Sequence, residues 1–325
     1  MTAIWVIWAA VLLDLLIGDP RWLPHPVIGM GKVIRRVEGW IRHRATTAQG
    51  LKRAGILLPV IVAGGSFVLT WLLLLLCAAI HPWLAWGAEV VLIATTIAVK
   101  GLRDAGLEVY SHLCSGNLAK ARYSLSMVVG RDTDHLDEPE VVRGTVETVA
   151  ENIVDAVIAP LLFALIGGAP LAMAYRAVNT LDSMVGYKNE KYESLGWASA
   201  RLDDIANWIP ARLTAGLLTV VAAMFSLQWK QAIAMVKRDA RKHPSPNSGF
   251  PESAVAGALG IRLGGENSYQ GVISFRAYMG DPERALHAEH IRVTTRLLLG
   301  VSILFTVLGT AVLGLITAAG GALWL

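Results

Sequence analysis

Acidic side chains recur at helical spacing in the segment 147–155. Glu147, Glu151 and Asp155 are each four residues apart, so an α-helix would place the three carboxylates on one face. Like charges at this spacing destabilise a helix by roughly 0.2–0.5 kcal/mol per pair, and desolvation beside the following apolar segment adds to the cost. A divalent cation or a bound amine would relieve both costs. The alternative is a solvated stripe at a membrane boundary.

A second polar face is predicted in the segment 175–188. Arg176, Asn179, Asp182, Ser183 and Gly186 share one side of a helix by their spacing. Hard oxygen ligands suit Mg²⁺ and the phosphates that it binds, and a glycine permits close approach. Polar packing between membrane helices is the alternative interpretation.

A third cluster combines acids and an amide just before an apolar stretch. Asp203, Asp204 and Asn207 can share a face, and paired acids of this kind could bind Mg²⁺. Arg201 and Arg212 could instead be their salt-bridge partners. The sequence leaves these two interpretations open.

The segment 238–252 is predicted to contain an irregular loop. Three prolines and a glycine argue against a helix through 244–251. Basic residues flank the loop, which offers hydroxyls, an amide and free backbone N–H groups, and these are the components of an anion-binding nest. A surface turn is the alternative.

Other nucleotide and metal motifs are incomplete. Gly29-Met-Gly31-Lys32 is followed by Val33, so it is not a complete Walker A loop, and an ATP site would be of another kind. His287 and His290 lack the H-E-x-x-H pattern of zinc hydrolases. The two cysteines, Cys77 and Cys114, form no disulfide framework.

The elements that must position these residues are membrane helices. Charged residues make up 17% of the 325-residue chain, against about 25% in typical soluble domains, the apolar fraction is 54% and the mean hydropathy is +0.50. These values exclude disorder, collagen and coiled coil, and we expect no nucleic-acid partner. The fold class is all-α: one integral-membrane domain over 1–325, with five or six spans in the lipid bilayer. The predicted spans are 3–17, 55–80, 83–99, 156–175, 211–229 and 297–323.

Single residues predict where some of the helices begin and end. His81-Pro82 should end one helix of a membrane hairpin, and Asp137 should cap the helix that follows it, with proline at an early position. Glu89 is an acid within an apolar run, which we expect to reach only the membrane interface. No strand alternation is convincing anywhere.

The distribution of basic residues predicts orientation. Blocks 18–53 and 230–296 carry an excess of Lys and Arg and should face the cytoplasm. Block 176–212 is balanced, and simple alternation of the spans would place it outside, in conflict with nucleotide chemistry there. A broken or re-entrant segment at 156–175, with Gly167-Gly168 and Pro170, would remove the conflict.

Taken in order, these motifs resemble one family. The chain is similar to the membrane-bound adenosylcobinamide-phosphate synthases (cobinamide synthases) of cobalamin biosynthesis over nearly its whole length. The matching segments lie at 15–22 with His25-Pro26, 130–133, 147–152, 175–184, 201–212 and 243–252. The most specific are Tyr-Arg-Ala-Val-Asn-Thr-Leu-Asp-Ser-Met at 175–184 and His-Pro-Ser-Pro-Asn-Ser-Gly-Phe-Pro-Glu at 243–252.

The resemblance implies an ATP-dependent amide ligase in the inner cell membrane. Such enzymes join a propionate carboxylate of adenosylcobyric acid to aminopropanol or aminopropanol phosphate, with Mg²⁺ expected. Activation through an acyl phosphate would require charge stabilisation and a proton acceptor. The sequence leaves a homo-oligomer and other cobalamin-pathway enzymes open as partners.

We assign candidate roles on this basis. The catalytic candidates are Glu147, Glu151, Asp182 and Asp203, with Glu147 or Asp203 as the proton acceptor. The candidate metal ligands are Glu151, Asp155 and Asp182. The candidates for substrate or phosphate binding are Arg131, Asp132, Arg176, Asn179, Lys188, Arg201, His243, Ser245, Asn247 and Ser248.

Two other classes of function compete with this one. A Mg²⁺-dependent membrane prenyltransferase-like enzyme would also place acid-rich helix ends near apolar spans. A non-catalytic corrinoid-binding scaffold or transporter would explain apolar cavities but not three separate acid and amide clusters. Turnover of isoprenoid diphosphates would support the first, and corrinoid binding without ATP consumption would support the second.

Overall fold

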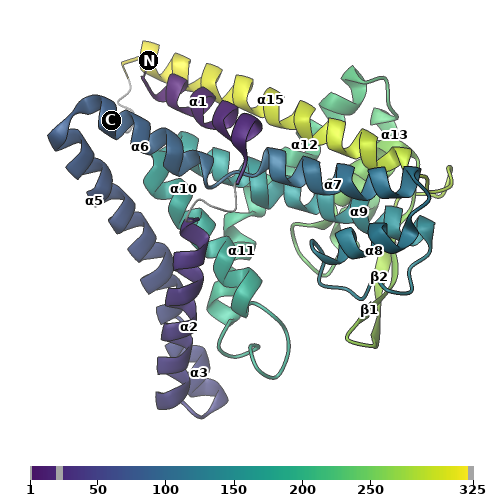
Figure 1. Ribbon diagram of the computed structural model, residues 1–325, viewed down its shortest axis with the longest axis horizontal. Coiled ribbons are helices and arrows are strands. Elements are labelled where there is room, and N and C mark those ends of the chain that lie inside the picture. Colours follow the sequence, from purple (N-terminus) through teal and green to yellow (C-terminus); the bar gives the residue numbers. More distant parts are fainter. Residues whose placement is uncertain (1, 20–24, 321–325) are drawn as a thin grey trace. The chain divides into compact units, whose positions relative to one another are not determined.

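The structure, a computed structural model, describes residues 2–19 and 25–320, and it is predominantly helical (Figure 1). Contacts within the chain define two compact units. The first unit comprises Met1–Ala98, Ala159–Asn207 and Thr306–Leu325, and the second comprises Val99–Ile158 and Trp208–Phe305. That the chain forms one integral-membrane domain stays a prediction.

Each helix or strand except α15 lies within one of the two units. The first contains α1 (Thr2–Ile17), α2 (Pro26–Arg44), α3 (Ala48–Ala54), α4 (Leu57–Pro59), the π-helix η1 (Val60–Gly64), α5 (Gly65–Ile80), α6 (Pro82–Ala94), α10 (Ala159–Val185) and α11 (Trp197–Ala206). The second contains α7 (Val99–Cys114), α8 (Leu118–Ser126), α9 (Glu138–Ile153), the π-helix η2 (Val154–Ile158), α12 (Trp208–Met224), α13 (Trp229–Asp239), the 3₁₀-helix η3 (Ala240–Lys242), α14 (Gly249–Leu259), β1 (Leu263–Tyr269) and β2 (Val272–Met279). The long helix α15 (Glu289–Ala318) contributes residues to both.

Several helices are long and apolar enough to cross a membrane. Within the described residues, four continuous stretches qualify, and a fifth qualifies if Trp197–Ala206 and Trp208–Met224, bent by 41°, form one span. The four stretches are Ala48–Ile80, Pro82–Cys114, Glu138–Val185 and Glu289–Ala318. The prediction of an all-α, multi-pass membrane protein is therefore confirmed, and five of the six expected spans coincide with these helices. The sixth coincides with α1, a shorter apolar helix of 16 residues.

The predicted helix ends are confirmed where a single residue determines them. Helix α5 ends at Ile80, and α6 begins at Pro82, where the His81 ring nitrogen accepts the N–H of Trp83 at 3.2 Å. Asp137 caps α9 by accepting the N–H of Glu140 at 3.0 Å. Proline and a side-chain acceptor at these positions satisfy or remove donors that a helix start leaves unpaired.

Helix α10 is broken at the predicted glycine pair. Gly168 has φ 63° and ψ −160°, a conformation that glycine adopts without a steric penalty. The break frees the N–H of Ala169, which donates to the Glu89 carboxylate at 3.2 Å. Glu89 is 1% exposed, so its carboxylate is enclosed by protein, where it caps the second half of α10 within the first unit. That Glu89 reaches the membrane interface stays a prediction.

A β-hairpin is the main departure from the sequence-based expectation that no segment forms strands. Strands β1 and β2 pair antiparallel, with a register shift between Leu263 and Gly265. The chain reverses at Gln270 and Gly271, which have φ 52° and 79°. Positive φ at both central residues is the requirement of a type I′ turn. Glycines interrupt the alternation in β1, which hides the strand from a pattern of apolar and polar residues.

Candidate functional site

The second unit contains a buried ion-pair cluster centred on Glu147. Its two carboxylate oxygens accept from Arg131 Nη2 at 2.6 Å and Arg143 Nη1 at 2.9 Å, and the N–H of Gly264 donates to Oε1 at 2.8 Å. Glu147 is 1% exposed. Because two guanidinium groups stabilise its charged form, Glu147 is poorly suited to accept a proton. Its proposed role as a base stays a prediction, and this geometry does not favour that role.

The same arginines fix the hairpin to α9. Arg131 Nη1 donates to Asn267 Oδ1 at 2.6 Å, and Arg143 Nη2 donates to the Glu266 carbonyl at 2.8 Å. Arg143 also pairs with Glu140. Arg131 therefore links the hairpin to Glu147 of α9. That Arg131 binds phosphate stays a prediction.

Asp132 holds the hairpin turn. Its carboxylate accepts from Ser268 Oγ at 2.5 Å and from the N–H groups of Gln270 and Gly271 at 3.0 and 2.9 Å. These hydrogen bonds, that from Ser268 most of all, lower the pKa of Asp132. The geometry gives Asp132 a structural task in addition to its predicted contact with substrate.

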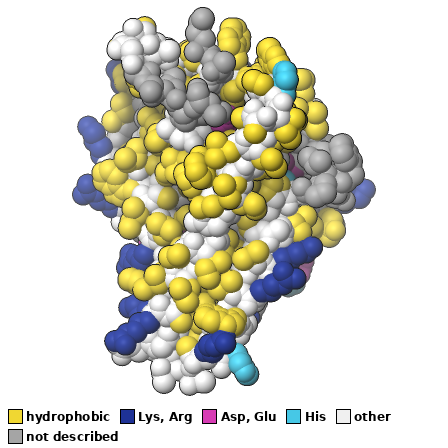
Figure 2. Space-filling view, turned by 90° about the vertical axis from the view of Figure 1, so that its left-hand side faces the viewer, with side chains coloured by type: hydrophobic (Ala, Val, Ile, Leu, Met, Phe, Trp, Pro, Cys, Tyr) yellow, Lys and Arg dark blue, Asp and Glu magenta, His cyan; other side chains and the backbone are white. Residues whose placement is uncertain are grey.

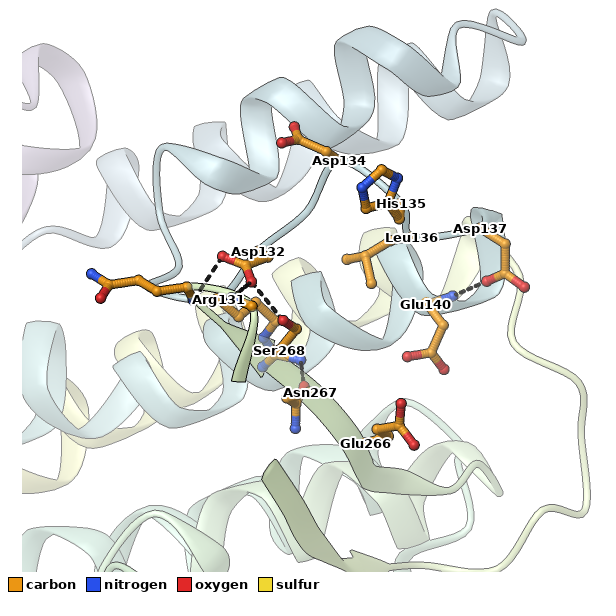
Figure 3. A pocket seen from close by; sticks show the side chains of 12 residues that line it. Arg131, Asp132, Asp134, His135, Leu136, Asp137, Glu140, Glu266, Asn267 and Ser268 are labelled. Carbon is orange, nitrogen blue, oxygen red and sulfur yellow. Dashed lines mark hydrogen bonds between the residues drawn. The ribbon is translucent and has the colours of Figure 1, made fainter. Parts of the chain in front are cut away.

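Beside this turn lies an open pocket of about 680 Å³ (Figure 3). Figure 3 shows Asp134 and His135 on the loop before α9, opposite Asn267 and Glu266 of β1. The lining residues are Arg131, Asp132, Asp134, His135, Leu136, Asp137, Glu140, Glu266, Asn267, Ser268, Gln270 and Gly271. Carboxylates dominate this set, so the pocket favours cationic or hydrogen-bond-donating groups over free phosphates.

Glu151 contacts the loop before α14. Its Oε1 accepts from Ser248 Oγ at 2.7 Å. Glu147 and Glu151 lie on α9 as expected, but the α-helical spacing ends at Ile153 and Asp155 falls in the π-helix η2. The α-helical repeat that the spacing predicts is therefore interrupted before its third member, and a shared face for all three carboxylates stays a prediction.

The loop 243–248 uses its side chains to form its own turn. Ser245 Oγ accepts the N–H groups of Asn247 and Ser248, both at 3.2 Å, and His243 Nδ1 accepts the N–H of Ser245 at 3.0 Å. Asn247 Oδ1 accepts from Arg212 Nη1 at 3.3 Å. The loop is shorter than predicted: α14 begins at Gly249 because Pro251 lies in its first turn, where the missing N–H is tolerated.

Glu252, at the start of α14, is a candidate that the sequence reasoning did not single out. It is completely buried, and neither carboxylate oxygen has a hydrogen-bond partner among the described residues. Burial, then the nearby charges of Glu151 and Glu147, raise the pKa of Glu252 well above its usual value. His243 Nε2 lies 3.6 Å from Glu252 Oε1, and burial lowers the pKa of His243. Burial therefore disfavours the charged form of both groups.

The first unit brings the second and third sequence clusters together. Tyr175 OH donates to Asn207 Oδ1 at 2.8 Å, and Asn207 Nδ2 donates to Asp203 Oδ2 at 3.0 Å. Asn179 and Asp182, from the end of α10, lie close to Asp203. The other oxygen of Asp203 is buried without a hydrogen-bond partner in the part of the chain that the structure describes. Two helices thus concentrate carboxylate and amide groups at one point.

Gly186 leaves room for the Asp182 side chain. A Cβ at this position would lie 2.0 Å from Asp182 Oδ1 and 2.7 Å from the Asp182 carbonyl oxygen. The group that lies against Gly186 is the Asp182 carboxylate. That Gly186 permits the close approach of a phosphate stays a prediction.

Cationic side chains border a small pocket in the same unit. The pocket has a volume of about 230 Å³ and is lined by Gly186, Tyr187, Lys188, Tyr192, Glu193, Gly196, Trp197, Ala200, Arg201 and Asp204. Arg201 pairs with Asp204 at 3.4 Å, as the salt-bridge interpretation predicts, while Arg212 instead stacks on Trp208 and Phe250. Arg176 Nε is buried with no hydrogen-bond partner among the residues described.

The proposed metal ligands fall in different units, with Asp182 in the first and Glu151 and Asp155 in the second. Across the described residues, no group of three or more His, Cys, Asp and Glu side chains is arranged to hold a metal ion. Mg²⁺ often uses only one or two protein carboxylates together with water and substrate phosphates. Asp182 and Asp203, with the unpartnered oxygen of Asp203, fit this kind of site.

The helices and the buried polar groups define a multi-pass membrane protein with acid, amide and cationic side chains gathered at the ends of its helices. Comparison with known sequences gives the family. The chain belongs to the CobD/CbiB protein family, whose model matches residues 7–298.

Its relatives match over nearly their whole length. It is 48% identical over 312 residues to the cobalamin biosynthesis protein CobD of Geobacter metallireducens, covering 96% of this chain and 97% of the relative. It is 46% identical to the CobD protein of Photorhabdus laumondii, covering 95% of this chain and 98% of the relative. It is also 46% identical to the cobalamin biosynthesis protein CbiB of Salmonella typhimurium, covering 89% of this chain and 91% of the relative. No solved structure matches the chain.

Proposed function

We propose that this protein catalyses an ATP-dependent step of cobalamin biosynthesis in the inner cell membrane, the formation of an amide bond between a corrinoid carboxylate and an amino alcohol. The relatives are named as cobalamin biosynthesis proteins, which supports the pathway and a corrinoid substrate. The resemblance described above supplies the reaction: adenosylcobyric acid would be joined to aminopropanol or its phosphate.

The observation that carries the proposal is the meeting of α10 and α11 in the first unit. Asp182, Asn179 and Asp203 lie together there, and Gly186, next to Asp182, lines the pocket that also contains Lys188 and Arg201. Oxygen ligands beside cationic groups are the recurring components of phosphoryl-transfer sites. The corrinoid-scaffold and prenyltransferase alternatives gain no specific support from this arrangement.

The chemistry needs two steps. A carboxylate oxygen of the corrinoid attacks the γ-phosphorus of ATP, and the bond to the ADP oxygen breaks, which leaves an acyl phosphate. The amine nitrogen then attacks the acyl carbon, inorganic phosphate leaves with the electron pair of the carbon–oxygen bond, and one proton of the amine must be removed.

Residues of the first unit can serve both steps. A Mg²⁺ ion bound at Asp182 would neutralise charge on the transferring phosphoryl group. Lys188 and Arg201 would contact phosphate oxygens, with Arg176 as a further donor. Asp203 is better placed than Glu147 to accept the proton of the amine, because Asp203 accepts from the neutral Asn207 amide, whereas two guanidinium groups pair with Glu147.

Mass spectrometry tests the reaction directly. Purified protein in detergent is incubated with adenosylcobyric acid, aminopropanol phosphate, ATP and Mg²⁺. We expect a corrinoid product heavier by the amine minus one water, formed only with ATP. Corrinoid bound without product, in the presence of every substrate, would contradict the proposal and favour the scaffold.

A further inference from the structure

An apolar groove runs between α2 and the segment η1–α5 in the first unit. It has a volume of about 450 Å³ and is lined by Pro26, Gly29, Met30, Val33, Ile61, Val62, Gly65, Ser66, Leu69, Thr70 and Met173. The lining positions of α2 follow the i, i+3, i+4, i+7 pattern of one helix face and extend about 10 Å along its axis. Only Ser66 and Thr70 bring polar side chains, so the groove suits a hydrocarbon chain and not a soluble polar metabolite.

The groove leads toward a strongly basic end of the same helices. Beyond Val33, Arg36 and Trp40 continue the face of α2 at i+3 and i+7, and the Arg44 guanidinium stacks on Trp40 at 4.3 Å from the ring centre. On the other wall, Arg53 lies two turns before Ile61. Both Arg36 and Arg53 are exposed.

The segment that forms the two walls of the groove carries a net positive charge. Residues 25–70 contain seven Lys and Arg side chains and one acid, Glu38, which already pairs with Arg42. Figure 2 shows a face rich in hydrophobic side chains, with Lys and Arg side chains at its lower end and along its two sides. An apolar groove that ends in cations and a Trp–Arg stack has the pattern of a molecule that meets both the hydrocarbon and the headgroup layers of a bilayer.

We propose that this groove is a specific binding site for an anionic phospholipid. One acyl chain would lie between Val33 and Leu69, and the headgroup phosphate would contact Arg36 and Arg53. A zwitterionic lipid has the same chain but no net charge to match the basic end. The site is separate from the cluster around Asp182 and does not depend on the proposed reaction.

Two glycines of α2 provide a matched test. A Cβ added at Gly29, which lines the groove, or at Gly39, which does not, meets no atom within 4 Å. A Cβ is therefore accommodated at both positions, and of the two leucine variants only Gly29→Leu extends into the groove. We expect Gly29→Leu to lower binding of phosphatidylglycerol by about tenfold or more, and Gly39→Leu to leave it near the wild-type level.

The measurement is native mass spectrometry of the full chain, delipidated in detergent and titrated with phosphatidylglycerol or with phosphatidylcholine of the same chains. Wild type should prefer phosphatidylglycerol, and Arg36→Gln with Arg53→Gln should remove the preference. Equal binding of the two lipids by wild type, or unchanged binding by a folded Gly29→Leu protein, would overturn the proposal. Competition by glycerol 3-phosphate alone would do the same, since it would show that the groove is not used. If Gly29→Leu fails to fold, the double arginine variant decides.

Discussion

At the scale of single residues, Asp182 is the side chain on which the proposed reaction depends most. We expect Asp182→Ala to reduce amide formation by roughly two orders of magnitude or more, because it removes an oxygen ligand from the site of charge development. Folding should persist, as judged by size-exclusion chromatography and thermal unfolding, since Asp182 lies at the end of α10. Glu190→Gln, an exposed carboxylate nearby, is the control. Near-normal turnover in Asp182→Ala would remove this residue from the site.

We expect substitution of Glu147 to lower the stability of the folded protein. Glu147→Gln leaves Arg131 and Arg143 buried without their shared carboxylate, and breaking such a buried pair costs about 3–5 kcal/mol. Glu140→Gln also removes a partner of Arg143, but Glu140 is 39% exposed and the loss should be about 1 kcal/mol or less. Thermal unfolding in one detergent compares the two. Equal shifts in melting temperature would show that the Glu147 cluster is not a stability centre.

Glu252 predicts a pH dependence of stability. Its pKa is raised in the folded protein, so the folded state keeps a proton that the unfolded chain releases. Stability is therefore full below the ordinary pKa of a glutamic acid and falls as the pH rises above it, by up to about 1.4 kcal/mol per pH unit for one group. Glu252→Gln cannot ionise and should flatten this decline, measured as melting temperature between pH 5 and 9. An unchanged slope, with Glu266→Gln as control, would show that Glu252 is not the responsible group.

At the scale of elements, the break in α10 and its cap should act as a unit. Glu89→Leu leaves the N–H of Ala169 buried and unpaired, and we expect a loss of about 1–3 kcal/mol. Glu89→Gln keeps an acceptor oxygen and should lose much less. Melting temperature and amide formation are measured for both. A large loss of turnover in Glu89→Gln at unchanged stability would show instead that the charge of Glu89 serves the reaction.

Local signals explain which elements the sequence predicts. The spans follow from long apolar runs, and the starts of α6 and α9 follow from proline and a side-chain acceptor. The hairpin was missed because its strands carry glycine, asparagine and serine, and its only local signal is Gln270-Gly271, a weaker form of the Asn-Gly turn.

The candidate site was predicted less completely than the helices. The spacing along 175–186 identifies one polar face, but that Asp203 lies beside it depends on how α11 packs on α10. Glu252 was missed for a related reason: its complete burial comes from the packing of α14, and a lone glutamate near a helix start is indistinguishable by sequence from an exposed one.

At the scale of the whole molecule, the side of the membrane that each block faces decides whether ATP can reach the proposed site. The excess of basic residues in blocks 18–53 and 230–296 predicts that both blocks face the cytoplasm. The block 176–212 contains Asp182 and Asp203, so it must also be accessible from the cytoplasm if the protein uses ATP. The glycine break in α10 makes this compatible with the spans, because a broken segment can return to the side from which it entered.

Cysteine labelling tests this orientation. In a Cys114→Ser background, Thr46→Cys, Glu190→Cys and Ala285→Cys each place one thiol at an exposed position of a different block; the remaining native thiol, Cys77, is buried. We expect a membrane-impermeant maleimide to label all three in inside-out vesicles and none in intact spheroplasts. Labelling of Glu190→Cys from the outside alone would place the Asp182 cluster away from cytoplasmic ATP. The phosphoryl-transfer role would then have to pass to the second unit. There Glu252 and His243 lie buried, and the atoms that they turn toward each other have no hydrogen-bond partner among the described residues.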